Sequence, residues 1–149
     1  MEKKYVFNYK KLIKVLRLKQ IDKIALIIVE KGKILSTKSI GKNKFYIPGG
    51  KREKNETDYQ TLIREIKEEL SVDILHETIE YIGTFIAQSD GYTAGVNVKM
   101  TCYKADYLGI LKKNNEIEEI RWLSYNDLDI ISEVDKIIFD FLKKNGELY

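Results

Sequence analysis

The feature that most constrains this chain is the segment 45–74, in which a short apolar run and two glycines precede a carboxylate-rich helical pattern. Residues 45–47 predict a short strand, which Pro48 and the glycines at 49 and 50 end. Asn55 is a favourable N-cap, so we expect a helix from about Glu56, with acidic residues in the first turn where the helix dipole favours negative charge. The apolar residues that follow have helical spacing and predict one core-facing stripe. They are Tyr59, Leu62, Ile63, Ile66 and Leu70.

Three glutamates, Glu65, Glu68 and Glu69, share another face of this helix over little more than one turn. Like charges three or four residues apart destabilise a helix slightly, so a bound cation would compensate them. Mg²⁺ is a hard cation that takes carboxylate and phosphate oxygens. An acidic, solvated helix face is an equally simple interpretation of the helix alone.

Gly49 and Gly50 favour the metal interpretation because glycines let the backbone approach a ligand closely. A tight turn after a strand is the alternative for these two residues. Taken together, the strand, the glycine turn, the loop and the carboxylate helix indicate a site for a metal and a phosphate.

Composition limits the other possibilities. A chain of 149 residues with 44% apolar and 33% charged residues predicts a single folded domain. Cys102 is the only cysteine and His76 the only histidine, which excludes a disulfide framework and a cysteine–histidine zinc site. No apolar run has the roughly 20 residues of a membrane span, and the N-terminus is not typical of a signal peptide. We expect a cytoplasmic protein with no membrane contact.

The first 20 residues are basic, with seven Lys or Arg against one glutamate. We expect residues 1–20 to be an N-terminal extension and residues 21–149 to be the domain. Such a segment could contact phosphates or RNA. The simpler interpretation is an amphipathic element whose apolar residues dock on the domain. These residues are Leu12, Ile13, Val15 and Leu16.

The rest of the chain predicts strands and one further helix. Strands are expected at 23–30 and 33–39, joined by a turn at Lys31 and Gly32, and later at 79–88, 97–107 and 118–123. A helix is expected at 132–144, with one apolar side. That side comprises Val134, Ile137, Ile138, Phe141 and Leu142. This order predicts an α/β (α+β) sandwich with a mixed sheet.

The central segment resembles the signature of the Nudix (MutT-type) hydrolases, G-x5-E-x7-R-E-U-x-E-E-x-G-U, where U is a bulky aliphatic residue. The matching residues are Gly50, Glu56, Arg64, Glu65, Ile66, Glu68, Glu69 and Val72. Ser71 stands where the signature has its last glycine, which affects the turn after the helix rather than the metal site. The late segment 116–123 also resembles that family. The resemblance implies the Nudix α/β/α sandwich with a central mixed β-sheet.

The resemblance also implies a chemistry, the Mg²⁺- or Mn²⁺-dependent hydrolysis of a nucleoside diphosphate linked to another group. It makes Glu65, Glu68 and Glu69 the expected metal ligands, completed near Gly49 and the Gly50 carbonyl. Arg64 would orient a helix glutamate and Glu56 would brace Arg64 or the loop. Glu68, Glu69 or one late glutamate would activate water. The late candidates are Glu116, Glu118 and Glu119, with Glu116 also a candidate metal ligand.

The substrate is less constrained. The chain lacks the late proline expected of ADP-ribose enzymes, and its nearest tyrosine to the position expected of dinucleoside polyphosphate enzymes, Tyr92, is displaced. A (deoxy)nucleoside triphosphate, cleaved to monophosphate and pyrophosphate, is therefore the first choice. Alternatives are an RNA 5′-pyrophosphohydrolase and a non-catalytic nucleotide-binding module. The sequence leaves open whether two copies form a homodimer. It also offers aromatic residues that could stack on a base, namely Tyr46, Phe85, Tyr92 and Tyr103.

Overall fold

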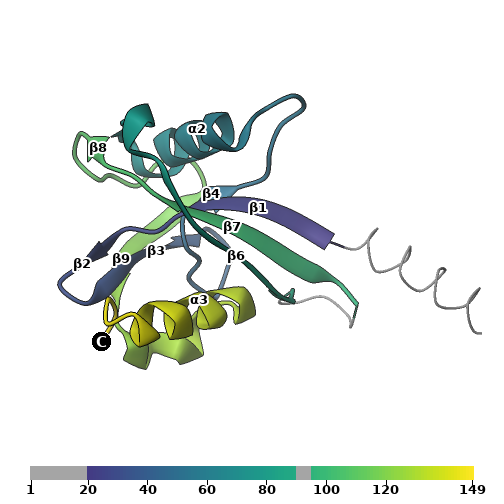
Figure 1. Ribbon diagram of the computed structural model, residues 1–149, viewed down its shortest axis with the longest axis vertical. Coiled ribbons are helices and arrows are strands. Elements are labelled where there is room, and N and C mark those ends of the chain that lie inside the picture. The colour runs from purple at the N-terminus through teal and green to yellow at the C-terminus, as the bar shows by residue number, and fades with distance from the viewer. Residues whose placement is uncertain (1–19, 90–94) are drawn as a thin grey trace, which may run out of the picture.

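The computed structural model describes residues 20–89 and 95–149, and its strands lie between two helices (Figure 1). The helices are α2 (Asp58–Leu70) and α3 (Glu133–Lys144), with short 3₁₀ turns at His76–Thr78 (η1) and Tyr125–Ile130 (η2). The strands are β1 (Gln20–Leu26), β2 (Val29–Glu30), β3 (Lys33–Ser39), β4 (Gly49–Gly50), β5 (Asp73–Ile74), β6 (Glu80–Gln88), β7 (Asn97–Lys104), β8 (Tyr107–Leu108) and β9 (Ile117–Leu123).

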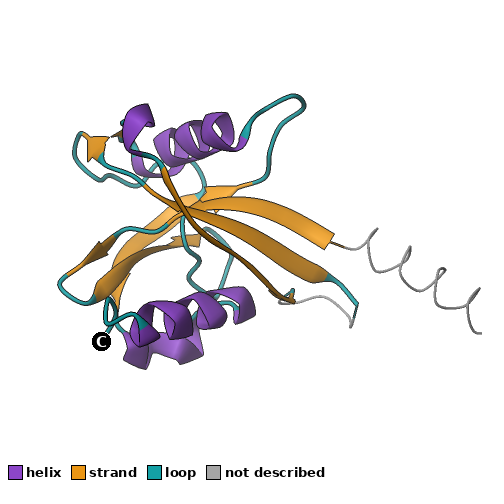
Figure 2. Cartoon of the chain, viewed as in Figure 1, coloured by secondary structure: helices purple, strands orange, loops and turns teal. Residues whose placement is uncertain are grey.

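The larger sheet is mixed and has the strand order β4-β1-β7-β6. Strand β1 runs parallel to β7 and antiparallel to β4, where Ile24 lies opposite Gly50. A second, antiparallel sheet has the order β2-β3-β9, and β5 pairs with β8. Strands with helices on both sides confirm the predicted α/β (α+β) sandwich with a central mixed sheet (Figure 2).

Each helix buries its apolar side in a separate core. Helix α2 packs on β1, β4 and β5, and its residues Leu62, Ile66 and Leu70 are fully buried, as the stripe predicts. Helix α3 packs on β6 and β7. The predicted apolar side of α3 is wrong at Ile137, which is 41% exposed, whereas Phe139 is fully buried. By helical spacing, Ile137 lies at one edge of the apolar stripe. The position of β6 and β7 decides which edge of the stripe is covered.

Helix α2 begins later than the sequence predicts. Asn55 is not its N-cap, because it has a positive φ of 66° and lies in the loop before the helix. Thr57 caps the helix instead, in a capping box with Gln60: each side chain bonds the backbone N–H of the other. At the other end, Ser71 has a φ of 62° and forms a left-handed C-cap, where the family signature has glycine.

Three predicted strands also have different limits. The strand expected at 97–107 is divided into β7, which ends at Lys104, and β8, which pairs with β5. Residues 23–30 do not form one strand, because β1 ends at Leu26 and residues 29–30 pair with β3 in the other sheet. Residues 45–47 form only isolated bridges, from Thr37 to Tyr46 and from Phe45 to Ile131. The strand at this point is Gly49–Gly50, which pairs with β1. The two glycines are therefore part of the sheet that supports α2.

The predicted basic extension lies outside the described residues except for Gln20, the first residue of β1. Its boundary at residue 20, and any contact of residues 1–19 with RNA, stay predictions. Among the described helices, none is long and apolar enough to cross a membrane.

Candidate active site

The carboxylates of α2 differ sharply in exposure. Glu69 is buried at 6% exposure. The side chain of Glu65 is 14% exposed and that of Glu68 is 44% exposed. The apolar stripe fixes this order, because Glu69 lies next to Leu70 and Ile66 on the side of the helix that faces β1 and β4. The predicted solvated face therefore applies to Glu68 and not to Glu69.

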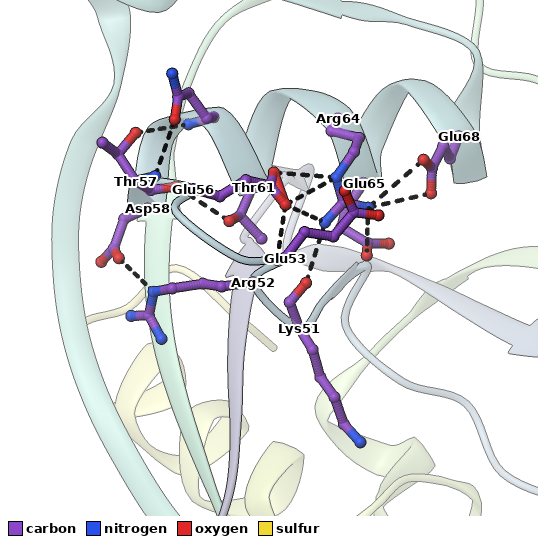
Figure 3. A network of polar contacts seen from close by, with 11 residues as sticks. Lys51, Arg52, Glu53, Glu56, Thr57, Asp58, Thr61, Arg64, Glu65 and Glu68 are labelled. Atoms are coloured by element: carbon purple, nitrogen blue, oxygen red, sulfur yellow. Dashed lines mark hydrogen bonds and ion pairs between the residues drawn. The ribbon is translucent and has the colours of Figure 1, made fainter.

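Arg64 joins the helix to the loop that precedes it (Figure 3). Its Nε and Nη2 donate to the Glu56 carboxylate at 2.8–3.1 Å, and its Nη1 donates to Glu65 at 2.9 Å and more distantly to Glu68 at 3.4 Å. Nη2 also donates to the carbonyl oxygen of Lys51 at 3.1 Å. Every guanidinium nitrogen thus has an acceptor, a geometry that suits the planar fork of arginine.

These contacts stabilise the charged forms of both partners. The hydrogen bond with Glu56 raises the pKa of Arg64 above its usual value, and that with Arg64 lowers the pKa of Glu56. The sequence predicted Arg64 as an orienting residue and Glu56 as its brace. The contacts have the form that those roles require.

The Glu69 carboxylate is in a different position. Burial, followed by the nearby charges of Glu65 and Glu116, raises its pKa to about 8. A hydrogen bond from the Gly49 backbone to the Glu69 carboxylate acts in the opposite direction and lowers this pKa. Within the part of the chain that the structure describes, Glu69 Oε2 is buried with no hydrogen-bond partner. A buried carboxylate oxygen in this state is costly unless something positive binds it.

The two glycines before the loop have different roles. Gly49 has a φ of 152°, and a Cβ at this position would collide with the backbone of Ile24 on β1. A Cβ on Gly50 would instead collide with the carboxylate of Glu65. Gly49 therefore permits the strand pairing, and Gly50 leaves the space that the Glu65 carboxylate occupies.

A cavity of about 290 Å³ opens beside Glu69. Its walls include Gly49, Tyr46 and Glu116, which the sequence named. They also include residues that sequence reasoning missed. These are Lys23, Lys42, Lys51 and Ser132, with Ile21, Val98, Met100 and Val134 as apolar neighbours. One signal was available, because Lys23 lies within a strand, directly before the apolar end of β1.

The three late glutamates have different surroundings. Glu116 lines the cavity, and its charge raises the pKa of both Glu65 and Glu69. Glu118 is exposed and lies 3.5 Å from Lys38. Glu119 pairs with Arg121. Of the three candidates, the structure brings only Glu116 together with the carboxylates of α2.

The remaining candidates lie elsewhere or in the core. The Phe85 ring packs on Phe141, and Tyr103 donates a hydrogen bond of 2.6 Å to Asp58 at the start of α2. Tyr92 lies outside the described residues. Of the aromatic residues proposed to stack on a base, Tyr46 is the described one that lines the cavity.

The donor set fits a divalent cation in its chemistry. It offers carboxylate oxygens with like charges that repel each other, and one of these oxygens is buried without a partner in the described part of the chain. Among the residues described, however, no three carboxylate, imidazole or thiol groups already converge as a metal cage. Arg64 holds Glu65 and Glu68 by hydrogen bonds. The assignment of Glu65, Glu68, Glu69, Gly50 and Glu116 as metal ligands therefore stays a prediction.

Comparison with known proteins agrees with this architecture. The family model described as NUDIX domain matches residues 19–143. The uncharacterized Nudix hydrolase YvcI of Bacillus subtilis is 27% identical over 103 residues, which are 68% of this chain and 65% of that protein. The match thus spans slightly less than two thirds of that relative.

Solved structures show the same fold. The E. coli ORF135 protein has a TM-score of 0.64 and 26% identity, covering 84% of this chain and 91% of its own. The MutT NUDIX hydrolase of Burkholderia pseudomallei has a TM-score of 0.68 and 20% identity, covering 81% of this chain and 96% of its own. With the family model matching most of its length, the chain belongs to the NUDIX domain family.

Proposed function

We propose that this protein is a metal-dependent hydrolase that cleaves the pyrophosphate linkage of a nucleoside diphosphate joined to another group. The observation that carries the proposal is Glu69, which lines a cavity with Glu116 and Gly49 and whose buried carboxylate oxygen has no hydrogen-bond partner among the described residues. Membership of the NUDIX domain family and similarity to a Nudix hydrolase support it.

Each residue of the site has an expected role in this reaction. Glu65, Glu68 and Glu69, with Gly50 and Glu116, would hold Mg²⁺ or Mn²⁺, which when bound neutralises phosphate charge and lowers the pKa of bound water. Arg64 holds Glu65 and Glu56 in place through its hydrogen bonds. Either an α2 glutamate or Glu116 takes the proton of the attacking water.

The first-choice substrate is a (deoxy)nucleoside triphosphate, released as monophosphate and pyrophosphate. The absent late proline and the displaced tyrosine argue against ADP-ribose and dinucleoside polyphosphates. The cavity of about 290 Å³ supports this choice. Its volume is at the lower end of small-molecule sites, which suits one nucleoside better than two.

The test is a substrate screen with wild-type protein and Mg²⁺ or Mn²⁺. The panel comprises nucleoside triphosphates, ADP-ribose, dinucleoside polyphosphates, and triphosphorylated or capped RNA, with phosphate products measured. We expect metal-dependent release of pyrophosphate from triphosphates, and loss of that release in a folded Glu69→Gln variant. Binding of nucleotides without any turnover by the wild type would instead favour the non-catalytic module. Turnover of RNA alone would favour the 5′-pyrophosphohydrolase.

A further inference from the structure

Lys23 is the cation that faces the cavity from the larger sheet. It lies in β1 directly before the buried residues Ile24, Ala25 and Leu26, and pairs in register with Met100 of β7. Both Lys23 and Met100 line the cavity. The backbone of two paired central strands therefore fixes the position of Lys23, whereas an exposed loop lysine would not be held in this way.

The ammonium of Lys23 lacks an acceptor in the described part of the chain. Its Nζ lies over the Tyr46 ring, 5.6 Å from the ring centroid. By contrast, Lys104 Nζ donates to both oxygens of Glu147 at 2.8 and 2.9 Å. An ammonium has three donors. Holding it beside a cavity without an acceptor is unfavourable unless water or a ligand supplies oxygens.

The charges around Lys23 come from several elements. Asp135 of α3 and Glu69 of α2 favour its charged form, whereas Lys42 and Lys51, from the segments around β4, oppose it. Burial has the largest effect and lowers the pKa of Lys23. Three lysines thus surround one cavity, and an anion bound between them would relieve their mutual repulsion.

We propose that Lys23 is a substrate-binding residue that donates a hydrogen bond to a phosphate oxygen in this cavity and thereby helps to select polyphosphate substrates. The identity of the anion, a phosphate of a nucleotide, rests on the function proposed above. The cavity also has apolar lining residues, Val98, Met100 and Val134, which suit the uncharged part of the substrate. Because Lys23 binds phosphate both before and during the reaction, its loss raises KM more than it lowers kcat.

The experiment measures binding of inorganic pyrophosphate by calorimetry in the presence of Mg²⁺. The variants are Lys23→Met, which keeps the length of the side chain, and Lys23→Arg, which keeps the charge. Lys33→Met is the matched control, because Lys33 is an exposed residue of β3 that does not line the cavity. Circular dichroism verifies that each variant is folded.

A hydrogen bond to a charged group contributes about 1.5–3 kcal/mol, so Lys23→Met is expected to weaken pyrophosphate binding about 10- to 100-fold. Lys23→Arg retains part of the affinity, and Lys33→Met retains all of it. Unchanged binding by Lys23→Met, or no binding of pyrophosphate by the wild type, overturns the inference.

Steady-state kinetics with the substrate found in the screen then separate the two proposals. A raised KM with little change in kcat in Lys23→Met supports the role of Lys23. Normal hydrolysis with normal pyrophosphate binding in that variant overturns this role and leaves the proposed function intact. If pyrophosphate binding depends on Lys23 but the protein has no hydrolytic activity, the role of Lys23 is supported and the proposed function is overturned.

Discussion

Two groups of charges meet at helix α2, and they differ in how fully they are paired. The loop group comprises Arg64, Glu56 and Glu65. In it, every guanidinium nitrogen of Arg64 donates to an acceptor, and the Glu56 carboxylate accepts three of these hydrogen bonds (Figure 3). In the cavity group, which comprises Glu69 and Lys23, Glu69 Oε2 is buried with no hydrogen-bond partner among the residues that the structure describes, and the Lys23 ammonium lies over the Tyr46 ring.

The difference indicates a division of labour between structure and chemistry. A fully paired network of charges fixes the positions of its members. Unpaired charges are costly to the free protein, and they persist where a ligand supplies the missing partner. Under the proposed function, Arg64 and Glu56 position the carboxylates of α2, whereas Glu69 and Lys23 would bind the metal and the substrate. Substitutions in the two groups should have different effects.

The largest changes in activity and stability are expected from substitutions of the neighbouring glycines, Gly49 and Gly50. In Gly50→Ala, the new Cβ displaces the Glu65 carboxylate, which is the end of a side chain and not backbone, so the protein folds but loses activity by about 100-fold, the effect of a misplacement of about 1 Å. In Gly49→Ala, the new Cβ meets the Ile24 backbone at a φ of 152°, so stability falls by about 3 kcal/mol or more. Thermal melts and turnover measure both. Equal loss of stability in the two variants would contradict the separate roles.

The next effect comes from breaking the loop group at Arg64. In Arg64→Met, the carboxylates of Glu56 and Glu65 lose their partner, which should lower activity about 10- to 100-fold and also lower stability. Lys67→Met is the control, because Lys67 is on the same helix but pairs with Asp73 at the surface. Urea denaturation and kcat measurements test this. If Arg64→Met keeps full activity, Arg64 does not position the carboxylates.

A smaller effect should distinguish the late glutamates. Glu116→Gln is expected to lower activity about 10-fold, since Glu116 lines the cavity with Glu69. Glu118→Gln should leave activity unchanged, because this exposed side chain pairs with Lys38. Rates of pyrophosphate release at saturating metal measure the difference. A loss confined to Glu118→Gln would show that the late assisting residue is misassigned.

The sequence predicted the parts of this architecture that depend on local pattern. The helical stripe correctly placed Leu62, Ile66 and Leu70 in the core, and the resemblance correctly named the fold. The left-handed cap at Ser71 also follows from the glycine that it replaces. These features need only spacing along one element.

The rest depended on partners distant in the chain. Asn55 and Thr57 are both plausible N-caps, and the positive φ of Asn55 decided between them. Lys23 joins Glu69 and Glu116 at one cavity only because β1 lies between β4 and β7. No local pattern distinguishes Glu116 from Glu118, since sheet pairing and loop contacts separate them.

The most direct test of the account is the effect of Mg²⁺ on the melting temperature of wild type, Glu69→Gln and Glu77→Gln, an exposed control. At about 100 times its Kd, a cation that binds only the folded state adds about 2.7 kcal/mol, which is a rise of about 5 °C or more. The account predicts this rise for wild type and Glu77→Gln and its loss in Glu69→Gln. An equal rise in all three proteins would contradict the central claim that the buried carboxylate of Glu69 binds the metal.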